Sequence, residues 1–344
     1  MAYLFLIRQI SYLLIKNLSR KQFAALILTC VIVIAFMIAM MATDRSYVMA
    51  FAMLIINADV TSIKKIVKCS FWSTLFPLLV VMTCAKLGII IKDYILISTS
   101  GDRVAHCFGY SYYSSVSYMV LYLEIGYLFL KERNIKWIEI LVLSFINYEI
   151  YQLTTTRLPF FLFCGVLILD ILLIKFDWLN LNNPYLRVFV PLAFPVGCLF
   201  TYWCAKNYTP ANIFWRTMNI LFSSRLSLSH SAIMQYPPKL FGQYIEMQGN
   251  SIYSKGHFYF YIDSGFMYSI LAYGIIFTAL VVFMYSYLFW YSCKKNNKAL
   301  FIWCLAVLTF TVINNTWIAI TYNPMLLCFY TVLKEQKAKK FSLV

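Results

Sequence analysis

The amino-acid sequence predicts an all-α, polytopic membrane protein with about ten transmembrane helices, and three observations carry this prediction. Of the 344 residues, 62% belong to the apolar class that includes Tyr and Cys, and only 12% are charged, about half the charged share of a soluble domain. Mean hydropathy is +0.74. A soluble fold of this size cannot bury so much apolar surface, and the apolar residues are grouped in runs that approach the length of a bilayer-spanning helix.

Ten apolar runs are expected to be spanning helices, because a span needs about 20 apolar residues or fewer where flanking side chains reach the interface. They lie near residues 23–42, 46–60, 70–91, 109–130, 138–153, 158–175, 187–206, 265–292, 299–313 and 317–333. Residues 1–15 are apolar but short, and Arg8 interrupts them. We expect an interfacial helix there, with an eleventh span as the alternative, and no cleavable signal peptide.

The distribution of the 29 Lys and Arg residues predicts the orientation of the chain. Basic clusters occur in alternate loops, at 16–21, 64–68, 131–136, 175–187, 294–298 and 334–340. Such clusters mark cytoplasmic loops, so both termini are expected in the cytoplasm. Most of the net charge of +16 is therefore a topology signal rather than the mark of a nucleic-acid-binding surface.

One long loop interrupts the pattern of short outer connections. Residues 207–264 lie between two spans on the extracytoplasmic side, within a single integral membrane domain covering 1–344, and loops of this length are usually functional. Thr209 followed by Pro210 is typical of a helix start, which predicts a short helix through about Leu221. A second short helix is expected from Ser224 to Gln235.

Several kinds of chemistry lack the motif they need. The sequence contains no phosphate-binding loop of the Gly-x-x-x-x-Gly-Lys type, no Asp-x-Asp pair, no His-Glu-x-x-His and no Gly-x-Ser-x-Gly. Most of the ten cysteines lie inside apolar runs and none forms a Cys-x-x-Cys pair, so they are interpreted as small hydrophobic residues. No metal site is expected.

Five arginines at or beyond the outer boundary are the most informative charges. They are Arg45, Arg103, Arg157, Arg216 and Arg225. The guanidinium fork suits phosphate oxygens and stays charged at a membrane surface, so this set favours recognition of an anion. The alternative is that the side chains only extend to lipid headgroups.

Ionisable residues also lie within the predicted spans. Lys86, Glu124 and Asp170 are at depth, and Glu149 is near an outer end. Such residues are costly in lipid and are candidates for function. A structural pair between Lys86 and Glu124 is at least as well supported by the sequence.

Four segments, taken in order, resemble a known family. They are Arg103-Val-Ala-His-Cys-Phe-Gly-Tyr110, Thr154-Thr-Thr-Arg157, Ser224-Arg225-Leu-Ser-Leu with Leu240-Phe-Gly242, and Tyr261-Ile-Asp-Ser264 with Leu271-Ala-Tyr-Gly-Ile-Ile276. Their order and shared outer location are similar to the Wzy-type polysaccharide repeat-unit polymerases, in the O-antigen polymerase and ligase-like family that serves bacterial capsule, exopolysaccharide and O-antigen pathways.

The resemblance implies a glycosyltransferase with a GT-C-like helical fold on the outer face of the bacterial cytoplasmic membrane. Such enzymes transfer the growing glycan from undecaprenyl diphosphate to another carrier-linked repeat unit. The implied partners are the lipid-linked oligosaccharide donor and acceptor, the bilayer, a chain-length regulator and other polysaccharide-export proteins. No cofactor, metal or nucleic acid is implied, because the leaving group is already activated.

The resemblance also implies roles for particular residues. Arg103, Arg157 and Arg225 would bind the diphosphate, with Arg216 as a helper, since preorganised Arg donors stabilise the charge of a leaving diphosphate. Three residues are candidates for the catalytic base: Asp263, which the resemblance indicates, and His230 and His257, which are weaker candidates because the pKa of an imidazole suits proton transfer. Asp263 matches the family position, although an acid there could instead stabilise the start of the following helix.

Two other functions remain open on the sequence. A flippase or transporter for lipid-linked oligosaccharide would also need cations, but deep in a central cavity and often with repeated halves. A transferase of the O-antigen-ligase type would use the same donor and pass the glycan to a different acceptor.

Overall fold

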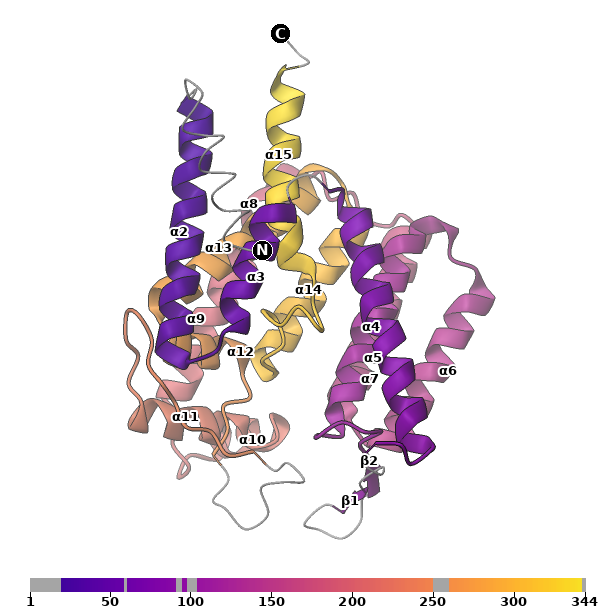
Figure 1. Cartoon of the computed structure of the whole chain (residues 1–344), viewed down its shortest axis with the longest axis vertical. Coiled ribbons are helices and arrows are strands. Elements are labelled where there is room, and N and C mark those ends of the chain that lie inside the picture. Colours follow the sequence, from indigo (N-terminus) through magenta and orange to yellow (C-terminus); the bar gives the residue numbers. More distant parts are fainter. Residues whose placement is uncertain (1–19, 59–60, 91–94, 98–103, 250–259, 342–344) are drawn as a thin grey trace.

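The computed structural model describes residues 20–58, 61–90, 95–97, 104–249 and 260–341, and these residues are predominantly helical (Figure 1). Within them, five helical stretches are long and apolar enough to cross a membrane: Leu26–Thr43, Ile63–Lys86, Arg157–Lys175, Pro184–Lys206 and Ile275–Lys294. The prediction of a helical membrane protein is confirmed at this level. The count of about ten spans stays a prediction, and residues 1–15 lie outside the described residues.

The elements follow the chain in a mostly up-and-down order. The first half contains α2 (Arg20–Thr43), α3 (Tyr47–Asn57), α4 (Ile63–Lys86), the strands β1 (Ile95–Ile97) and β2 (Val104–His106), α5 (Ser114–Lys131), α6 (Trp137–Thr154) and α7 (Arg157–Asp170), which continues as a π-helical turn, Ile171–Lys175. The two strands form an antiparallel hairpin in which Ile95 pairs with His106.

The second half contains more interruptions. It comprises α8 (Pro184–Phe189), a 3₁₀ turn (Val190–Leu192), α9 (Ala193–Lys206), α10 (Ile213–Leu221), α11 (Arg225–Gln235), α12 (Gly265–Tyr268) with a π turn (Ser269–Tyr273), α13 (Ile275–Lys294), α14 (Lys298–Ile313), a 3₁₀ turn (Met325–Leu327) and α15 (Cys328–Phe341). In Figure 1, α4 to α7 form one group, α10 and α11 close one end, and α14 lies between the group and the remaining helices.

Ion pairs gather several of the basic loops at one end of the bundle. Lys64 bonds Glu132 at 3.1 Å, joining the start of α4 to the turn after α5. Asp177 accepts from Arg133 at 2.6 Å and also pairs with Lys298 at the start of α14, and these two cations lower the pKa of Asp177. The loops expected in the cytoplasm thus share an end, opposite α10 and α11 (Figure 1).

Aromatic side chains form the centre of the core between α9, α13 and the segment after α14. The rings of Phe194 and Tyr285 stack at 4.9 Å, and Tyr285 stacks on Trp317 at 5.6 Å. These three rings are fully buried. Stacking of these rings fills the space between the helices and the irregular segment of backbone after α14.

The tenth predicted span, 317–333, is wrong as a continuous helix. Residues 314–324 form turns and irregular backbone, a 3₁₀ turn follows, and α15 begins only at Cys328. Asn323 precedes Pro324, and the residue before a proline is disfavoured in the α conformation. The apolar composition of this stretch reflects burial in the bundle and not a spanning helix.

Two further expectations are corrected by local structure. The first loop helix begins at Ile213 with Asn212 as its N-cap, rather than at Thr209, because the Asn212 side chain accepts from the Phe214 amide at 2.9 Å. Lys86 does not pair with Glu124. Lys86 is exposed at the end of α4, whereas Glu124 is buried and neither carboxylate oxygen has a hydrogen-bond partner within the described chain.

The predicted span 265–292 is interrupted at Gly274, where the chain meets the outer loop. Gly274 has φ of 95° and ψ of 165°, a conformation almost restricted to glycine. Gly242 of the loop has φ of 82° and packs directly against it, so that an added Cβ on Gly274 would lie 2.3 Å from the Gly242 nitrogen. The Gln243 amide donates to the Ala272 carbonyl at 2.9 Å, and the Ile275 amide donates to the Lys239 carbonyl at 3.1 Å.

We predict that Gly274→Ala destabilises the protein, because it adds about 1–3 kcal/mol of backbone strain and a clash with the Gly242 backbone. The measurement is thermal unfolding in detergent followed by intrinsic fluorescence. Gly165→Ala is the matched control, since its added Cβ meets nothing within 4 Å and alanine is favoured in a helix. Equal melting temperatures for the two variants would contradict the proposed packing.

Candidate functional site

The candidate site is built around an ion pair between the long loop and the segment that follows it. Arg225 is the first residue of α11, and Asp263 precedes α12. The Arg225 Nε lies 3.6 Å from the Asp263 Oδ2, and the two side chains are 24% and 20% exposed. The pair is partly shielded from water but remains open to a ligand.

The turn between α10 and α11 directs Arg225 towards Asp263. Ser223 and Ser224 both adopt the left-handed conformation, with φ of 50° and 63°, and so reverse the chain sharply. Asn219 holds this turn, because its carbonyl accepts from the Ser224 amide at 2.8 Å and its side chain accepts from the Ser227 amide at 2.9 Å. Arg225 therefore has a fixed starting direction.

Two helix ends complement the charges of the pair. The Arg225 Nε donates to the carbonyl of Ile313, the last residue of α14, at 3.1 Å, where the helix carries partial negative charge. Ser264 caps α12, since its Oγ accepts from the Met267 amide at 3.5 Å. The cap is therefore Ser264, and Asp263 is directed to Arg225 beside the positive end of the helix.

Burial sets the electrostatics of this region. It raises the pKa of Asp263 above its usual value, and the positive charge of Arg225 opposes that rise. Burial also raises the pKa of the neighbouring Tyr261. Tyr118 of α5 lies within electrostatic reach of both members of the pair, and its ring contacts Phe310 of α14 at 5.2 Å.

A small apolar groove of about 50 Å³ lies between Arg225, α9 and the end of α14. Its polar lining is limited to a few groups, which include Arg225, Ser229 and Ser264. Most of the remaining lining is apolar and comes from α9, α14 and the start of α11. One of these apolar residues is Phe200 of α9, which is 56% exposed. A cation at one end of an apolar groove suits an anionic head group that carries a lipid tail.

A second cation lies near the same segment. Arg45, in the turn between α2 and α3, donates to the Tyr47 hydroxyl at 3.3 Å and lies over the Tyr268 ring at 5.2 Å. Tyr261 is within electrostatic reach of Arg45 and Asp263. The sequence placed Arg45 among the outer cations but not in the site, because only the tertiary contact between residues 45 and 268 reveals its neighbours.

The other residues proposed from the sequence are distributed around this end. Arg157 begins α7 and Arg216 lies on α10, and both are exposed. The His230 Nδ1 bonds the Ala205 carbonyl at 2.8 Å, and its ring contacts Tyr208 edge-on, an arrangement that joins α11 to α9. Arg103 and His257 lie outside the described residues.

The third and fourth motifs identified in the sequence contact each other. Ser224-Arg225 contacts Asp263 through the ion pair, and Leu240-Phe-Gly242 contacts Ala272 to Ile276 through backbone hydrogen bonds. Thr154 and Thr156 of the Thr-Thr-Thr-Arg segment form the turn between α6 and α7 and bond Ser117 at 2.7 and 3.0 Å. The motifs therefore provide hydrogen bonds between elements of the fold as well as the charged side chains of the site.

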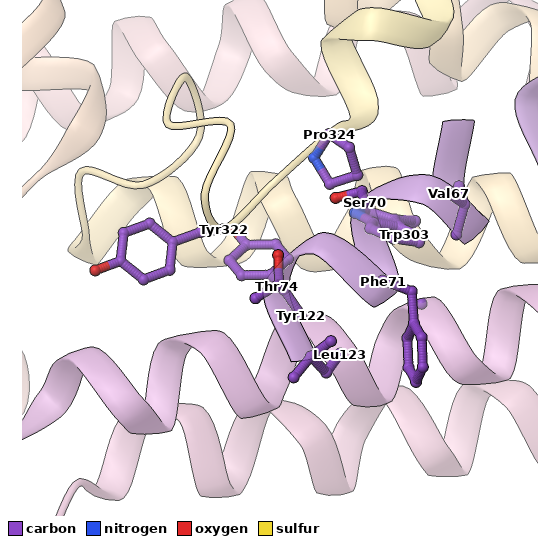
Figure 2. Close-up of a pocket in the computed structure, with 10 residues that line it drawn as sticks. Val67, Ser70, Phe71, Thr74, Tyr122, Leu123, Trp303, Tyr322 and Pro324 are labelled. Carbon is purple, nitrogen blue, oxygen red and sulfur yellow. The ribbon is translucent and has the colours of Figure 1, made fainter. Parts of the chain in front are cut away.

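A small crevice elsewhere in the bundle has a different character. Figure 2 shows it between α4, α5 and the irregular segment after α14, with Phe71, Tyr122, Trp303 and Tyr322 around it. Its lining includes the hydroxyls of Ser70, Thr74 and Tyr122 but no carboxylate or basic side chain. This crevice therefore lacks the paired charges found at Arg225 and Asp263. Within the described residues, no group of three or more His, Cys, Asp or Glu could hold a metal ion.

Comparison with protein-family models, with curated proteins and with solved structures found no match to this chain.

A double-mutant cycle tests the ion pair. Arg225→Ala leaves Asp263 buried without its cation, and Asp263→Asn removes the charge that Arg225 neutralises, so each single change is expected to lower the melting temperature. The double variant should lose less stability than the sum of the two, with a coupling of about 1 kcal/mol or more. The measurement is the set of four melting temperatures in one detergent. Additive losses would show that the contact contributes no coupling.

Proposed function

We propose that this protein is a membrane glycosyltransferase that polymerises undecaprenyl-diphosphate-linked oligosaccharide repeat units on the outer face of the bacterial cytoplasmic membrane. The observation that carries the proposal is the Arg225–Asp263 pair at one end of an apolar groove. The pair joins a cation suited to phosphate with a carboxylate suited to proton transfer, and both belong to segments that resemble the polymerase family.

The groove supports binding of the donor. The groove has a volume of only about 50 Å³, so an undecaprenyl chain would lie outside it, in the lipid along the exposed side chain of Phe200, with its diphosphate at Arg225. The Arg225 Nε is engaged by Ile313 and Asp263, and Nη1 points to the Phe222 carbonyl at 3.4 Å. Nη2 has no hydrogen-bond partner within the described chain and is the donor left for a phosphate oxygen.

The proposed reaction uses these two side chains. The acceptor hydroxyl attacks the anomeric carbon of the donor sugar, the bond from that carbon to the diphosphate oxygen breaks, and undecaprenyl diphosphate leaves. Asp263 accepts the hydroxyl proton, and Arg225 stabilises the charge that develops on the leaving oxygen. Asp263 is preferred over His230 as the base because His230 is engaged with the Ala205 carbonyl.

The remaining assignments stay part of the proposal. Arg103, Arg157 and Arg216 are proposed to assist with the diphosphate, and His257 stays a candidate base. The proposed partners are the donor and acceptor lipids, a chain-length regulator and polysaccharide-export proteins.

Deletion of the gene, followed by sizing of lipid-linked glycan, tests the function. A polymerase predicts single repeat units that accumulate on the outer leaflet. Units retained on the cytoplasmic face would favour a flippase, and finished polymer that stays lipid-linked would favour a ligase-type transferase; either result would overturn the proposal.

Arg225→Lys is expected to lower glycan elongation at least about tenfold, because Lys keeps the charge but not the fork that engages Ile313, Asp263 and phosphate together. The measurement is the rate of chain extension by purified protein in vesicles. Lys239→Gln, an exposed loop cation, is the matched control and should behave like wild type. Full activity of Arg225→Lys would exclude a role for the guanidinium fork in binding the diphosphate.

The pH dependence of elongation should report on Asp263. A base must be ionised, so wild-type activity should fall as pH decreases through the pKa of Asp263, which lies above its usual value. Arg225 lowers that pKa, so the residual activity of Arg225→Gln should fall at a higher pH than that of wild type. An unchanged acid limb would show that another group controls it, and Asp263→Asn should abolish the reaction.

A further inference from the structure

We propose that a second cavity, next to Arg45, is a saccharide-binding site and that it holds the acceptor glycan. The part that names the acceptor rests on the proposed function. The cavity has a volume of about 430 Å³ and is lined in part by the turn after α2, which lies at the same end of the bundle as α10 and α11 (Figure 1). This volume is within the usual range for small-molecule sites, about 300–1,000 Å³.

The lining of the cavity combines three charged groups from two segments. Asp44 and Arg45 come from the turn after α2, and Glu246 comes from the loop that follows Gly242. Tyr244 and Tyr268 provide aromatic lining. Tyr244 is 65% exposed, so its ring is available to a ligand, whereas Tyr268 is fully buried and forms a fixed wall.

Arg45 is held in place without a carboxylate partner within the described chain. Its Nη1 donates to the Tyr47 hydroxyl, which bonds the Tyr273 hydroxyl at 2.9 Å, and its guanidinium lies over the Tyr268 ring. A guanidinium has five N–H donors, and this geometry uses only one of them. Within the described residues the others have no hydrogen-bond partner, so they can donate to a ligand.

The charge balance distinguishes this cavity from the groove at Arg225. Two carboxylates and one guanidinium line it, so a diphosphate would meet a net negative lining. A saccharide carries hydroxyl groups that both donate and accept hydrogen bonds. Asp44 and Glu246 can accept from them, Arg45 can donate, and the exposed face of Tyr244 can pack against a sugar ring.

The position of the cavity connects it to the proposed base. Tyr268, the last residue of α12, lines the cavity, and Asp263 lies two residues before α12 begins. A glycan held beside Arg45 would therefore lie near the segment that carries Asp263. The geometry gives the two arginines separate tasks, the donor diphosphate at Arg225 and the acceptor saccharide at Arg45.

The experiment measures binding and kinetics with the full-length protein. The probes are the lipid-free repeat-unit oligosaccharide from the surface polysaccharide of the source bacterium and inorganic pyrophosphate, titrated into detergent-solubilised protein by calorimetry. Glu246→Gln and Arg45→Gln should each weaken oligosaccharide binding at least about tenfold. Arg225→Gln should leave oligosaccharide binding unchanged and weaken pyrophosphate binding.

Matched controls separate the cavity from general changes in surface charge. Glu149→Gln replaces another exposed glutamate, in the second half of α6, and Lys206→Gln replaces an exposed cation at the end of α9. Neither residue lines the cavity or the groove at Arg225. Both should bind the oligosaccharide like wild type. Glu246 is exposed, so its replacement should not impair folding, and an unchanged melting temperature checks this.

The results distinguish the cavity from the proposed function. In vesicles, Glu246→Gln should raise the KM for acceptor without changing the KM for donor. If the protein elongates glycan but the cavity variants leave oligosaccharide binding and acceptor KM unchanged, the inference is overturned and the function stands. The inference is also overturned if wild type binds no oligosaccharide, or if Arg45→Gln removes pyrophosphate binding instead. If oligosaccharide binds through Arg45 and Glu246 but gene deletion leaves the polymer intact, the saccharide site stands and the polymerase does not.

Discussion

The structure depends on how buried backbone that is not helical finds hydrogen-bond partners. Two such segments lie inside the bundle, around Gly274 and between α14 and α15. Unpaired amides and carbonyls are costly away from water. At Gly274 the partners come from the outer loop, and close approach is possible because Gly242 also lacks a side chain. After α14 the fully buried Asn323 provides them: its side chain donates to the Trp317 carbonyl at 3.1 Å and accepts from the Met325 amide at 3.2 Å.

The same interruptions create the site. Because α14 ends at Ile313, its last carbonyls are available, and Arg225 binds one of them. Because the chain enters α12 through Ser264, Asp263 lies beside a helix start and within reach of Arg225. A continuous helix in either place would have used these groups internally. The ion pair, the groove and the Arg45 cavity therefore all lie where regular structure stops.

Local sequence patterns predicted some of these elements and failed at others for physical reasons. The second loop helix, expected from Ser224 to Gln235, agrees with α11 within a residue, because Pro237 and Pro238 limit it. The predicted span 317–333 was wrong because hydropathy reports only that a segment is apolar. It cannot distinguish a spanning helix from irregular apolar backbone buried inside a bundle. Asn323 before Pro324 was the available signal. Lys86 and Glu124 have opposite charges but do not pair, and Glu124 has no hydrogen-bond partner within the described chain. Opposite charges in the sequence therefore do not establish that two residues form an ion pair.

The sequence by itself determined the class of the protein, a helical membrane protein, and the basic loops that meet at one end of the bundle, because composition and charge spacing are properties of the chain. It also identified Arg225 and Asp263 as candidate residues through their motifs. Only the tertiary structure decided that these two form a pair, that Ser264 and not Asp263 caps α12, and that Arg45 lines a cavity with Glu246. These contacts join segments far apart in the chain, and their geometry depends on packing that no local pattern encodes.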